Sequence, residues 1–417
     1  MFPDVVSLNK PRILSLSCVF PNPADPGFGL FVRARLNRLG QAAEVKVIAP
    51  IARIDFATAA RARFGRRGIP FRRRDGDLEI LHPAWTYPPG GFAINPVLLF
   101  QRVLPLAWRL RRRFDFQIID SHFGFPDGIA AVLLSKALGV PFTITLRGSE
   151  VVHAKYRWRR KLMAWAMRKA SRVFAVSERL RQFALALGAE SGRVKTIPNG
   201  VDPAVFYPRD RERCRRQSGI ATDAKIVLSA GTLIELKGHH RVARAVAGLR
   251  KRGLAAELLI AGRGGRYESE LRRQIAELRL EENVRLLGEL PAEEVAGLMS
   301  ASDVVCLASS REGWPNVVHE AMACGTPVVA TNVGAVEEMV GGLEHGWVVP
   351  PGDPAALEQA LFDAFQRQWD REGIGAWAHS RTWDRVTAEL LSEFRSIAGE
   401  SAGSESAPAA LASEPRR

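Results

Sequence analysis

The stretch Ser309–Val329, SSREGWPNVVHEAMACGTPVV, contains a loop, a helix and the start of a strand in direct succession. An apolar run at 303–307 precedes it, and a second run at 327–330 overlaps its end. Gly313 permits an unusual backbone conformation. Pro315 suits the first turn of a helix, because the N–H that proline lacks would be unpaired there. A strand, a helix and a further strand in this order predict a βαβ unit with parallel strands.

The same alternation of short apolar runs and amphipathic stretches extends outward along the 417 residues. In the first half, strands are predicted at 12–19, 44–48, 117–120, 141–146 and 172–176, and helices at 29–39, 126–138 and 158–170. A second series of strands is predicted at 225–230, 257–261, 284–287, 303–307, 327–330 and 347–349. The pattern predicts an α/β protein built from two consecutive doubly wound units.

The boundary between the two series lies at 197–203, IPNGVDP, which concentrates Pro, Asn and Gly as a turn or linker does. We therefore expect an N-terminal domain at 1–197 and a C-terminal domain at 198–370. The segment 371–397 is expected to contain a last helix over about 374–397, because its Trp, Val, Leu and Phe residues share one face. The tail 398–417 has almost no large apolar residues and is predicted to be disordered.

The charge of the chain is strongly asymmetric. Lys and Arg number 59 against 44 Asp and Glu, a net charge of +15, and residues 1–200 hold 33 of the basic but 13 of the acidic residues. Such asymmetry usually indicates a phosphate-rich partner, which can be nucleic acid, an anionic membrane or a charged substrate. Four scattered cysteines argue against a zinc site or a disulfide framework and fit a reducing cytosol. We see no secretory signal and no apolar run suited to span a bilayer, so a cytoplasmic location is expected.

Three basic clusters lie at 61–74, 109–113 and 157–169. The first contains Phe residues and the third contains Trp residues, whereas the second ends a predicted helix that begins in apolar residues. This composition favours a surface that contacts an anionic membrane, where each cation contributes about 1 kcal/mol. An arginine-rich surface that merely reflects coding bias stays open. A basic nucleic-acid-binding regulatory protein is a further alternative, although no nucleic-acid motif is present and the basic residues are not aligned on one helix. A dinucleotide-dependent oxidoreductase is disfavoured, because 262–265 lacks the full glycine spacing.

Two glutamates of the opening stretch are candidates for ligand binding. The first N–H groups of the predicted helix would face a ligand and suit an anion or a hydroxyl. Glu320 lies on a largely apolar helix, and a buried carboxylate requires a hydrogen-bond donor, which the sugar hydroxyls of a nucleotide would provide. Taken singly, Glu312 could be a surface acid and Glu320 a partner of the helix dipole.

This whole stretch resembles the signature of retaining glycosyltransferases of family 4, with Glu312 and Glu320 separated by seven residues and the run EAMACGTPVVA. The resemblance covers residues 11–395. It includes the segments 27–29, 121–128, 198–202, 231–238, 259–264, 283–288 and 334–338. It implies a GT-B fold, with two Rossmann-like domains facing each other across a cleft, a nucleotide sugar between them, and a C-terminal helix that crosses back to the first domain.

The resemblance also implies roles for individual positions. Lys237 matches the basic residue that holds the donor diphosphate, Glu312 belongs to the loop that grips the transferred sugar, and Glu320 matches the carboxylate that binds the nucleotide ribose. The further donor-binding candidates are Gly27, Gly29, Thr232, Gly262, Trp314, Pro315, Asn316 and Val317. Fixed cations and helix N–H groups would stabilise the leaving diphosphate, so no metal or other cofactor is expected.

Two positions depart from the commonest pattern of the family. Many relatives carry Arg where this chain has Thr232, and many carry His in the loop where this chain has 146–150, LRGSE. We therefore hypothesise that Arg147 supplies the second phosphate cation, since guanidinium suits bidentate phosphate binding. The alternative is a structural Arg147 paired with Glu150 or Asp127. His122 and Arg147 are also candidates for acceptor binding, and a structural turn histidine is the alternative for His122.

The sequence thus predicts a retaining glycosyltransferase that moves a sugar from a nucleoside-diphosphate sugar to an acceptor. A lipid-linked or growing cell-surface polysaccharide at the inner face of the cytoplasmic membrane is the favoured acceptor. A soluble small-molecule acceptor is the first alternative. In this family, the resemblance implies front-side attack in which the departing phosphate takes the acceptor proton, and proximity would supply much of the rate.

Overall fold

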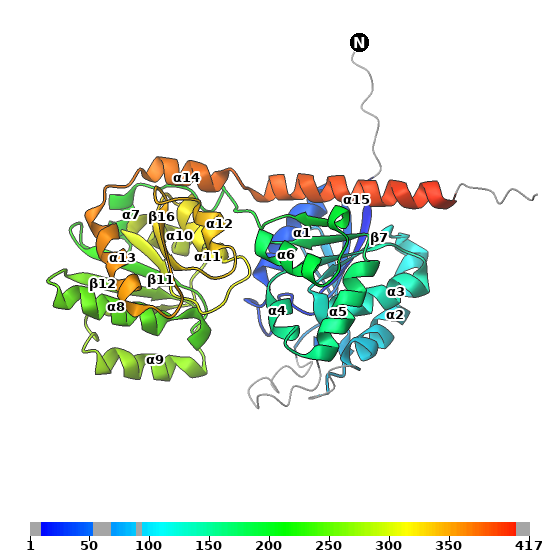
Figure 1. The fold of residues 1–417 in the computed structure, drawn as a ribbon, viewed down its shortest axis with the longest axis horizontal. Coiled ribbons are helices and arrows are strands. Elements are labelled where there is room, and N and C mark those ends of the chain that lie inside the picture. The colour runs from blue at the N-terminus through cyan, green and yellow to red at the C-terminus, as the bar shows by residue number, and fades with distance from the viewer. Residues whose placement is uncertain (1–9, 53–67, 89–93, 406–417) are drawn as a thin grey trace, which may run out of the picture. The chain divides into compact units, whose positions relative to one another are not determined.

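The computed structural model describes residues 10–52, 68–88 and 94–405, which form two compact units. Unit 1 contains the residues up to Ala175, Leu180–Ile197 and the residues from Val386 onward. Unit 2 contains Val176–Arg179 and Pro198–Arg385. Each unit is an α/β layer structure with its own sheet (Figure 1).

Unit 1 is built on an eight-stranded sheet of order β10-β9-β8-β7-β1-β2-β5-β4, parallel except for the antiparallel pair β4–β5. The strands are β1 Arg12–Leu16, β2 Glu44–Ile48, β4 Arg72–Asp75, β5 Leu78–Leu81, β7 Ile118–His122, β8 Phe142–Leu146, β9 Arg172–Ala175 and β10 Val194–Thr196, and β3 Ile51–Ala52 pairs separately with β6 Ala84–Trp85. The helices are α1 Leu30–Ala42, α2 Asn95–Phe114, α3 Ile129–Leu138, α4 Ser149–His153, α5 Arg157–Lys169 and α6 Glu178–Ala186, with a π-turn at Gly124–Gly128 and a 3-10 turn at Ser191–Arg193. Every residue of β7 and β8 is buried, as expected for parallel strands covered by helices on both faces.

Unit 2 is built on a six-stranded parallel sheet of order β13-β12-β11-β14-β15-β16. The strands are β11 Lys225–Ala230, β12 Ala256–Ala261, β13 Val284–Gly288, β14 Val304–Leu307, β15 Val328–Thr331 and β16 Gly346–Val349. The helices are α7 Arg211–Gln217, α8 His239–Lys251, α9 Arg266–Glu277, α10 Ala292–Ala301, α11 Asn316–Ala323, α12 Val336–Val340, α13 Pro354–Gln366 and α14 Arg371–His379, with a 3-10 turn at Glu235–Lys237. Numbered along the chain, this strand order is 3-2-1-4-5-6, the order of the dinucleotide-binding Rossmann fold.

The sheet of unit 2 has a separate apolar core on each face. Ile226, Leu228 and Ala230 of β11 pack into one core, whereas Val227 between them packs into the other. Alternate residues of a strand point to opposite faces, so one short apolar run fills both cores. Helices α8, α9 and α13 cover one face, and α7, α10, α11, α12 and α14 cover the other (Figure 1). The continuous apolar runs of the sequence are therefore strands buried on both sides.

The C-terminal segment differs from the predicted single helix over 374–397. The structure has two helices, α14 and α15 (Trp383–Glu405), separated at Ser380–Thr382. The break is set by tertiary structure, since Thr382 forms a parallel bridge with Val201 and a Cβ on Gly200 would lie 2.3 Å from the Trp383 nitrogen. Residues 398–405 belong to α15, so the prediction of disorder is wrong there, and the rest of the tail lies outside the described residues.

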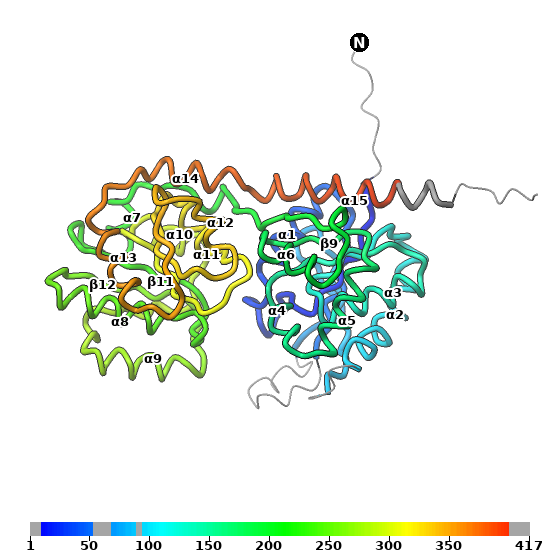
Figure 2. Tube along the Cα trace, in the orientation of Figure 1, coloured from blue at the N-terminus to red at the C-terminus, as the bar shows by residue number. Residues whose placement is uncertain are grey.

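Helix α15 joins unit 1 beyond Arg385. Its Phe394 packs edge-on against Phe174 of β9 at 5.9 Å between ring centroids, and Glu393 accepts a 2.8 Å hydrogen bond from the Nε of Arg172. The tube in Figure 2 shows α15 running past β9. Strand β9 is thus covered by residues more than two hundred positions away in sequence.

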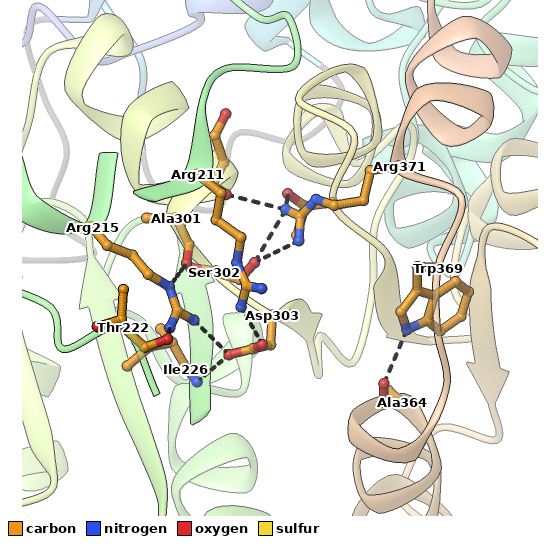
Figure 3. Close-up of polar contacts among 12 residues, drawn as sticks. Arg211, Arg215, Thr222, Ile226, Ala301, Ser302, Asp303, Ala364, Trp369 and Arg371 are labelled. Carbon is orange, nitrogen blue, oxygen red and sulfur yellow. Dashed lines mark hydrogen bonds and ion pairs between the residues drawn. The ribbon is translucent and has the colours of Figure 1, made fainter. Parts of the chain in front are cut away.

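A cluster of arginines holds the amino-terminal edge of the unit 2 sheet, opposite the edge at which ligands of such sheets bind (Figure 3). Asp303, just before β14, accepts hydrogen bonds from Arg211, from Arg215 at 3.0 Å and from the backbone of Ile226 at 2.7 Å. Arg371 of α14 donates to the carbonyl of Ser302 and to the Thr326 hydroxyl. The arginines of this cluster therefore tie helices to strand ends.

Candidate active site

The candidate site in unit 2 lies where the strand order reverses. In open α/β sheets, ligands bind beyond the carboxyl ends of the strands at this switch point. Here it lies between β11 and β14, whose following loops are 231–238 and 308–315. The first loop carries Lys237 and the second carries Glu312, so the topology brings both residues to one edge of the sheet.

Three glycines allow the loops at this edge to touch through their backbones. A Cβ on Gly238, where φ is +73°, would lie 2.0 Å from the Ala308 carbonyl oxygen. A Cβ on Gly262 would lie 1.8 Å from the Gly231 oxygen. A Cβ on Gly334, where φ is +61°, would lie 2.6 Å from the Gly313 oxygen. No other residue type fits these approaches without displacing a loop. The loops at the carboxyl edge therefore contact one another directly through their backbones.

Lys237 and Glu312 form an ion pair between two of these loops. The Lys237 Nζ lies 2.7 Å from the Glu312 Oε1, and the Ser309 hydroxyl donates to the same oxygen at 2.8 Å. The two loops are also joined by a 2.9 Å hydrogen bond from the Ser310 N–H to the Leu236 carbonyl. Because Lys237 and Glu312 retain 24% and 11% side-chain exposure, their charges are partly shielded but can be reached by a ligand. Ser309 was not among the predicted site residues, although it lies two residues after the strand predicted at 303–307.

The Gly313–Val317 segment leads into α11. The helix begins at Asn316 and Pro315 is its N-cap, so the expectation that Pro315 lies within the first turn is wrong by one position. The Pro315 carbonyl accepts from the Val318 N–H at 3.0 Å, and Asn316 accepts from the Asn199 side chain at 3.1 Å. The Trp314 ring contacts His319 edge-on, with 5.9 Å between centroids. Val317 is half-buried and packs against the core beneath.

Glu320 is half-buried on α11, one turn into the helix. Burial raises the pKa of its carboxyl to about 7, although nearby Lys237 opposes the shift. Within the part of the chain that the structure describes, no hydrogen-bond donor is found for this carboxylate. A ligand hydroxyl that donated to Glu320 would stabilise its ionised form.

The remaining donor-binding candidates are divided between the two units. Thr232 is exposed after β11, and Gly262 follows β12 in unit 2. Gly27 and Gly29 lie in unit 1, after β1. Gly29 has a φ of +78° and is the N-cap of α1, and a Cβ there would lie 2.7 Å from the Val19 oxygen. Gly29 is thus required by the close approach of its own loop to Val19.

The carboxyl edge of unit 1 holds Arg147 and His122 side by side. Arg147 directly follows β8, and His122 is the last residue of β7 rather than the first residue of a loop. The Arg147 Nη2 lies 3.1 Å from the His122 Nδ1, and the guanidinium lies 5.1 Å from the centre of the Phe31 ring. Arg147 is 8% exposed and His122 is completely buried. Burial lowers the pKa of Arg147 to about 9, and the charge of Arg35 acts in the same direction.

The carboxylates proposed as alternative partners of Arg147 bind backbone N–H groups. Glu150 accepts from the backbone of Gly124 at 2.9 Å, of Gly148 at 2.8 Å and of Arg147 itself at 3.2 Å. Asp127 accepts from the backbone of Cys18 at 3.0 Å. Burial raises the pKa of both carboxyls, that of Asp127 to about 7. Both residues thus shape the loops around Arg147.

The basic clusters have different environments. In the first one, residues 61–67 lie outside the described residues. Arg72 and Arg73 form ion pairs with Glu79 and Asp75 in the β4–β5 hairpin, at 2.8 and 3.2 Å. The other two clusters lie on α2 and α5, and no acidic residue occurs at 80–114 or 151–177. Within the described part of unit 1, α2 and α5 therefore carry basic residues with no acidic residue on either helix.

The described residues offer neither a metal-binding cluster nor a membrane-spanning helix. Among the described residues, no group of three or more His, Cys, Asp or Glu side chains is arranged to hold a metal ion. No helix within the described ranges has both the length and the apolar character needed to cross a bilayer. All four cysteines lie in the described part and are free thiols.

Two family models match the chain, one in each unit. Residues 71–205 match Glycosyltransferase Family 4, and residues 210–378 match Glycosyl transferases group 1. A D-inositol 3-phosphate glycosyltransferase of Pseudarthrobacter chlorophenolicus is 30% identical over 355 residues, which are 77% of this chain and 84% of that protein. The putative teichuronic acid biosynthesis glycosyltransferase TuaC of Bacillus subtilis is 26% identical over 395 residues, 92% of this chain and 93% of that protein.

Solved structures share the fold. Sucrose-phosphate synthase from Thermosynechococcus elongatus has a TM-score of 0.70 at 21% identity, covering 95% of this chain and 98% of that one. Anabaena HepE in complex with UDP and glucose has a TM-score of 0.65 at 21% identity, covering 95% and 99%. The similarity therefore extends over both units.

Proposed function

Because the chain belongs to glycosyltransferase family 4, has the GT-B fold and is a glycosyltransferase that acts on a nucleotide sugar, we propose that it retains the anomeric configuration of the sugar that it transfers. We further propose a lipid-linked or growing cell-surface polysaccharide as the acceptor, presented at the anionic inner face of the cytoplasmic membrane. The observation that carries the catalytic part is the Lys237–Glu312 ion pair at the switch point of unit 2.

In this proposal Lys237 contacts the donor diphosphate. As the glycosidic bond breaks, negative charge develops on the leaving phosphate, so a fixed cation stabilises the transition state more than the bound donor. Glu320 accepts a hydrogen bond from a ribose hydroxyl, and the Gly313–Val317 backbone contacts the transferred sugar. No metal is assigned a role.

Retention is supported by how Glu312 is held. Its charge balances that of Lys237, and its Oε1 already accepts two hydrogen bonds. We therefore assign Glu312 to orienting Lys237 and the sugar, and not to removing the acceptor proton. The bond from the anomeric carbon to the phosphate oxygen breaks as the acceptor oxygen bonds on the same face. The acceptor proton passes to the departing phosphate oxygen, so the steps balance without an enzyme base.

Arg147 is assigned to the substrate phosphates in place of the arginine that relatives carry at the position of Thr232. Its guanidinium lies at the carboxyl edge of unit 1 and is already fixed against Phe31 and His122. A bidentate donor in a defined plane suits a phosphate. An acceptor phosphate or carboxylate would be bound by the same chemistry.

The membrane part of the proposal is supported by the outer face of α2. Ile94 just before α2, and Val97 and Trp108 on it, are 53%, 42% and 51% exposed and follow one another at helical spacing. Arg112 lies 4.1 Å from the centre of the Trp108 ring, and a surface hollow beside it is lined by Leu81, Leu106, Leu110, Arg109, Arg112 and Arg113. On α5, Trp158 is 68% exposed. Apolar side chains ringed by cations, with no acidic residue on either helix, suit an anionic lipid surface.

The names of two relatives favour different acceptors. TuaC is named for teichuronic acid biosynthesis, which supports a polymeric acceptor. The D-inositol 3-phosphate glycosyltransferases support a soluble small molecule as the alternative. Equal turnover of a small glycoside and of a lipid-linked acceptor, in the absence of detergent, would favour the alternative.

The test of retention uses the product itself. Nucleotide sugars are first screened by thermal shift, since a bound donor raises the melting temperature. The donor that binds is then incubated with the protein and membrane or small-molecule acceptors, and the anomeric coupling constant of the new bond is read by NMR. We expect the configuration of the donor to be kept. An inverted product would contradict the role given to Glu312.

The membrane proposal predicts a selective loss of vesicle binding. Replacing Arg109, Arg112 and Arg113 by Gln should weaken partition to anionic vesicles by about 100-fold at low salt, because each cation contributes about 1 kcal/mol. The matched control replaces Arg266, Arg272 and Arg273 of α9, a helix on which Arg272 and Arg273 pair with Glu268 and Glu270 at 2.8 and 2.7 Å. Cosedimentation measures both. Equal losses in the two triple variants, or no binding by the unmodified protein, would refute the α2 surface.

A further inference from the structure

Four buried polar side chains form a row across unit 1. Arg35 of α1 lies 3.9 Å from the Asp120 Oδ1. The Asp120 Oδ2 lies 3.3 Å from the His122 Nε2, and the His122 Nδ1 lies 3.1 Å from the Arg147 Nη2. Arg35, Asp120 and His122 are at most 1% exposed, and Arg147, at the carboxyl edge, is 8% exposed. The row thus connects the sheet interior to the residue assigned above to the substrate phosphates.

The contacts fix where the proton of His122 lies. A guanidinium donates hydrogen bonds and accepts none, so the His122 Nδ1 facing Arg147 must be the acceptor. The proton is then on Nε2, which lies within reach of the Asp120 carboxylate and 3.2 Å from the Ser15 hydroxyl oxygen. His122 is therefore a neutral imidazole with one nitrogen directed to each neighbour.

The charges of the row agree with this assignment. Burial lowers the pKa of His122 to about 4, against the opposing effect of Asp120. Burial alone would raise the pKa of Asp120, but His122, Arg35 and a 2.8 Å hydrogen bond from the Thr143 hydroxyl lower it to about 2. The hydrogen bond of Nε2 is with the Ser15 hydroxyl, and the negative charge of Asp120, 3.3 Å from Nε2, favours the proton on that nitrogen and leaves Nδ1 as the acceptor.

We propose that His122 is a positioning residue that fixes the plane of the Arg147 guanidinium, with Asp120 holding the imidazole in the required tautomer. The proposal rests on the role assigned to Arg147 under the proposed function. The Phe31 face restrains the guanidinium from one side, and His122 sets its rotation by taking one of its five N–H groups. A misplacement of about 1 Å in a group that contacts the reacting phosphates can lower the rate by about 100-fold.

Two variants of similar size distinguish the contact of His122 with Arg147 from its contact with Asp120. In His122→Asn the amide oxygen takes the place of Nδ1 and can still accept from Arg147. In His122→Gln the amide nitrogen takes the place of Nε2, so it can still donate toward Asp120 but no longer meets Arg147. We expect kcat/KM within about 3-fold of the unmodified enzyme for His122→Asn and a loss of 30- to 100-fold for His122→Gln. A purely structural histidine would make activity follow the melting temperature in both variants, and that result would overturn the proposal.

A double-mutant cycle tests the route through Arg147. In an Arg147→Met background, His122→Gln should cause no further loss, because the guanidinium that it positions is gone. Full, additive loss in that background would overturn the proposal. If Arg147→Met alone leaves kcat and donor KM unchanged, the phosphate role of Arg147 fails instead.

Nitrogen-15 NMR then decides the inference without reference to activity. At neutral pH we expect the His122 Nδ1 to be unprotonated and Nε2 to carry the proton, with the Nδ1 shift moving in Arg147→Met. A proton on Nδ1, or an Nδ1 chemical shift that is unchanged in Arg147→Met, would overturn the positioning role even if Arg147 is essential.

Discussion

Replacing Lys237 by Met is expected to lower kcat/KM by about 100- to 1,000-fold with little change in the melting temperature. The removal of one preorganised donor that stabilises developing charge typically has an effect of this size. The methylene stem is kept, and the glycine contacts that hold the 231–238 loop do not involve the lysine side chain nitrogen. Steady-state kinetics with the identified nucleotide sugar measure the loss, and circular dichroism measures the melting temperature.

The matched control for this variant is Lys251→Met at the exposed end of α8. It removes the same charge from the same unit and should leave kcat/KM within 2-fold, a typical result for surface substitutions away from a site. If Lys237→Met retained more than a fifth of the activity, the donor diphosphate would have to be neutralised by another group.

Glu312→Gln is expected to lower kcat by about 100-fold while the protein stays folded. The glutamine keeps an oxygen that accepts from the Ser309 hydroxyl but loses the charge that holds Lys237. Lys237 is then free to leave the position in which it meets the leaving phosphate, so the transition state loses more than the bound donor. Single-turnover kinetics at saturating donor measure this directly.

The losses of activity caused by the two substitutions should be strongly non-additive. Residues that act together make one joint contribution to catalysis, and either single substitution already removes it. The double variant should therefore be no more than about 5-fold slower than Lys237→Met alone. Glu294→Gln, an exposed acid in the first turn of α10, is the charge-matched control. Multiplied losses in the double variant would mean that Glu312 acts on the sugar independently of Lys237.

The strands were predictable because the apolar residues that indicate a buried strand lie within the strand's own sequence. The segments predicted at 44–48 and 225–230 match β2 and β11 residue for residue. All residues of β11 after Lys225 are buried, as expected for a parallel strand covered on both faces, and in β2 Val45, Val47 and Ile48 are buried. The resemblance to family 4 marked Lys237 and Glu312, and the strand order explains why they meet, because both follow strands whose carboxyl ends share an edge.

Features that depend on distant contacts were not predictable. Arg72–Asp75 has no apolar alternation, yet it forms β4 because it pairs with Leu78–Leu81 and its charges are met by Glu79 and Asp75. The strand predicted at 12–19 ends at Leu16, because Val19 belongs to the turn that Gly29 approaches. The tautomer of His122 depends on Arg147, which contacts it from the end of the neighbouring strand β8.

The glycine contacts of unit 2 bear on how this protein can be engineered. Gly238, Gly262 and Gly334 each place backbone against backbone, so the loops of the carboxyl edge cannot be adjusted one at a time. A library of variants intended to change donor specificity should keep these three glycines and vary side chains of the same loops, such as Thr232 and Trp314. Loop grafting from a relative should exchange all of these loops together, because the backbone of each loop packs against the backbone of another.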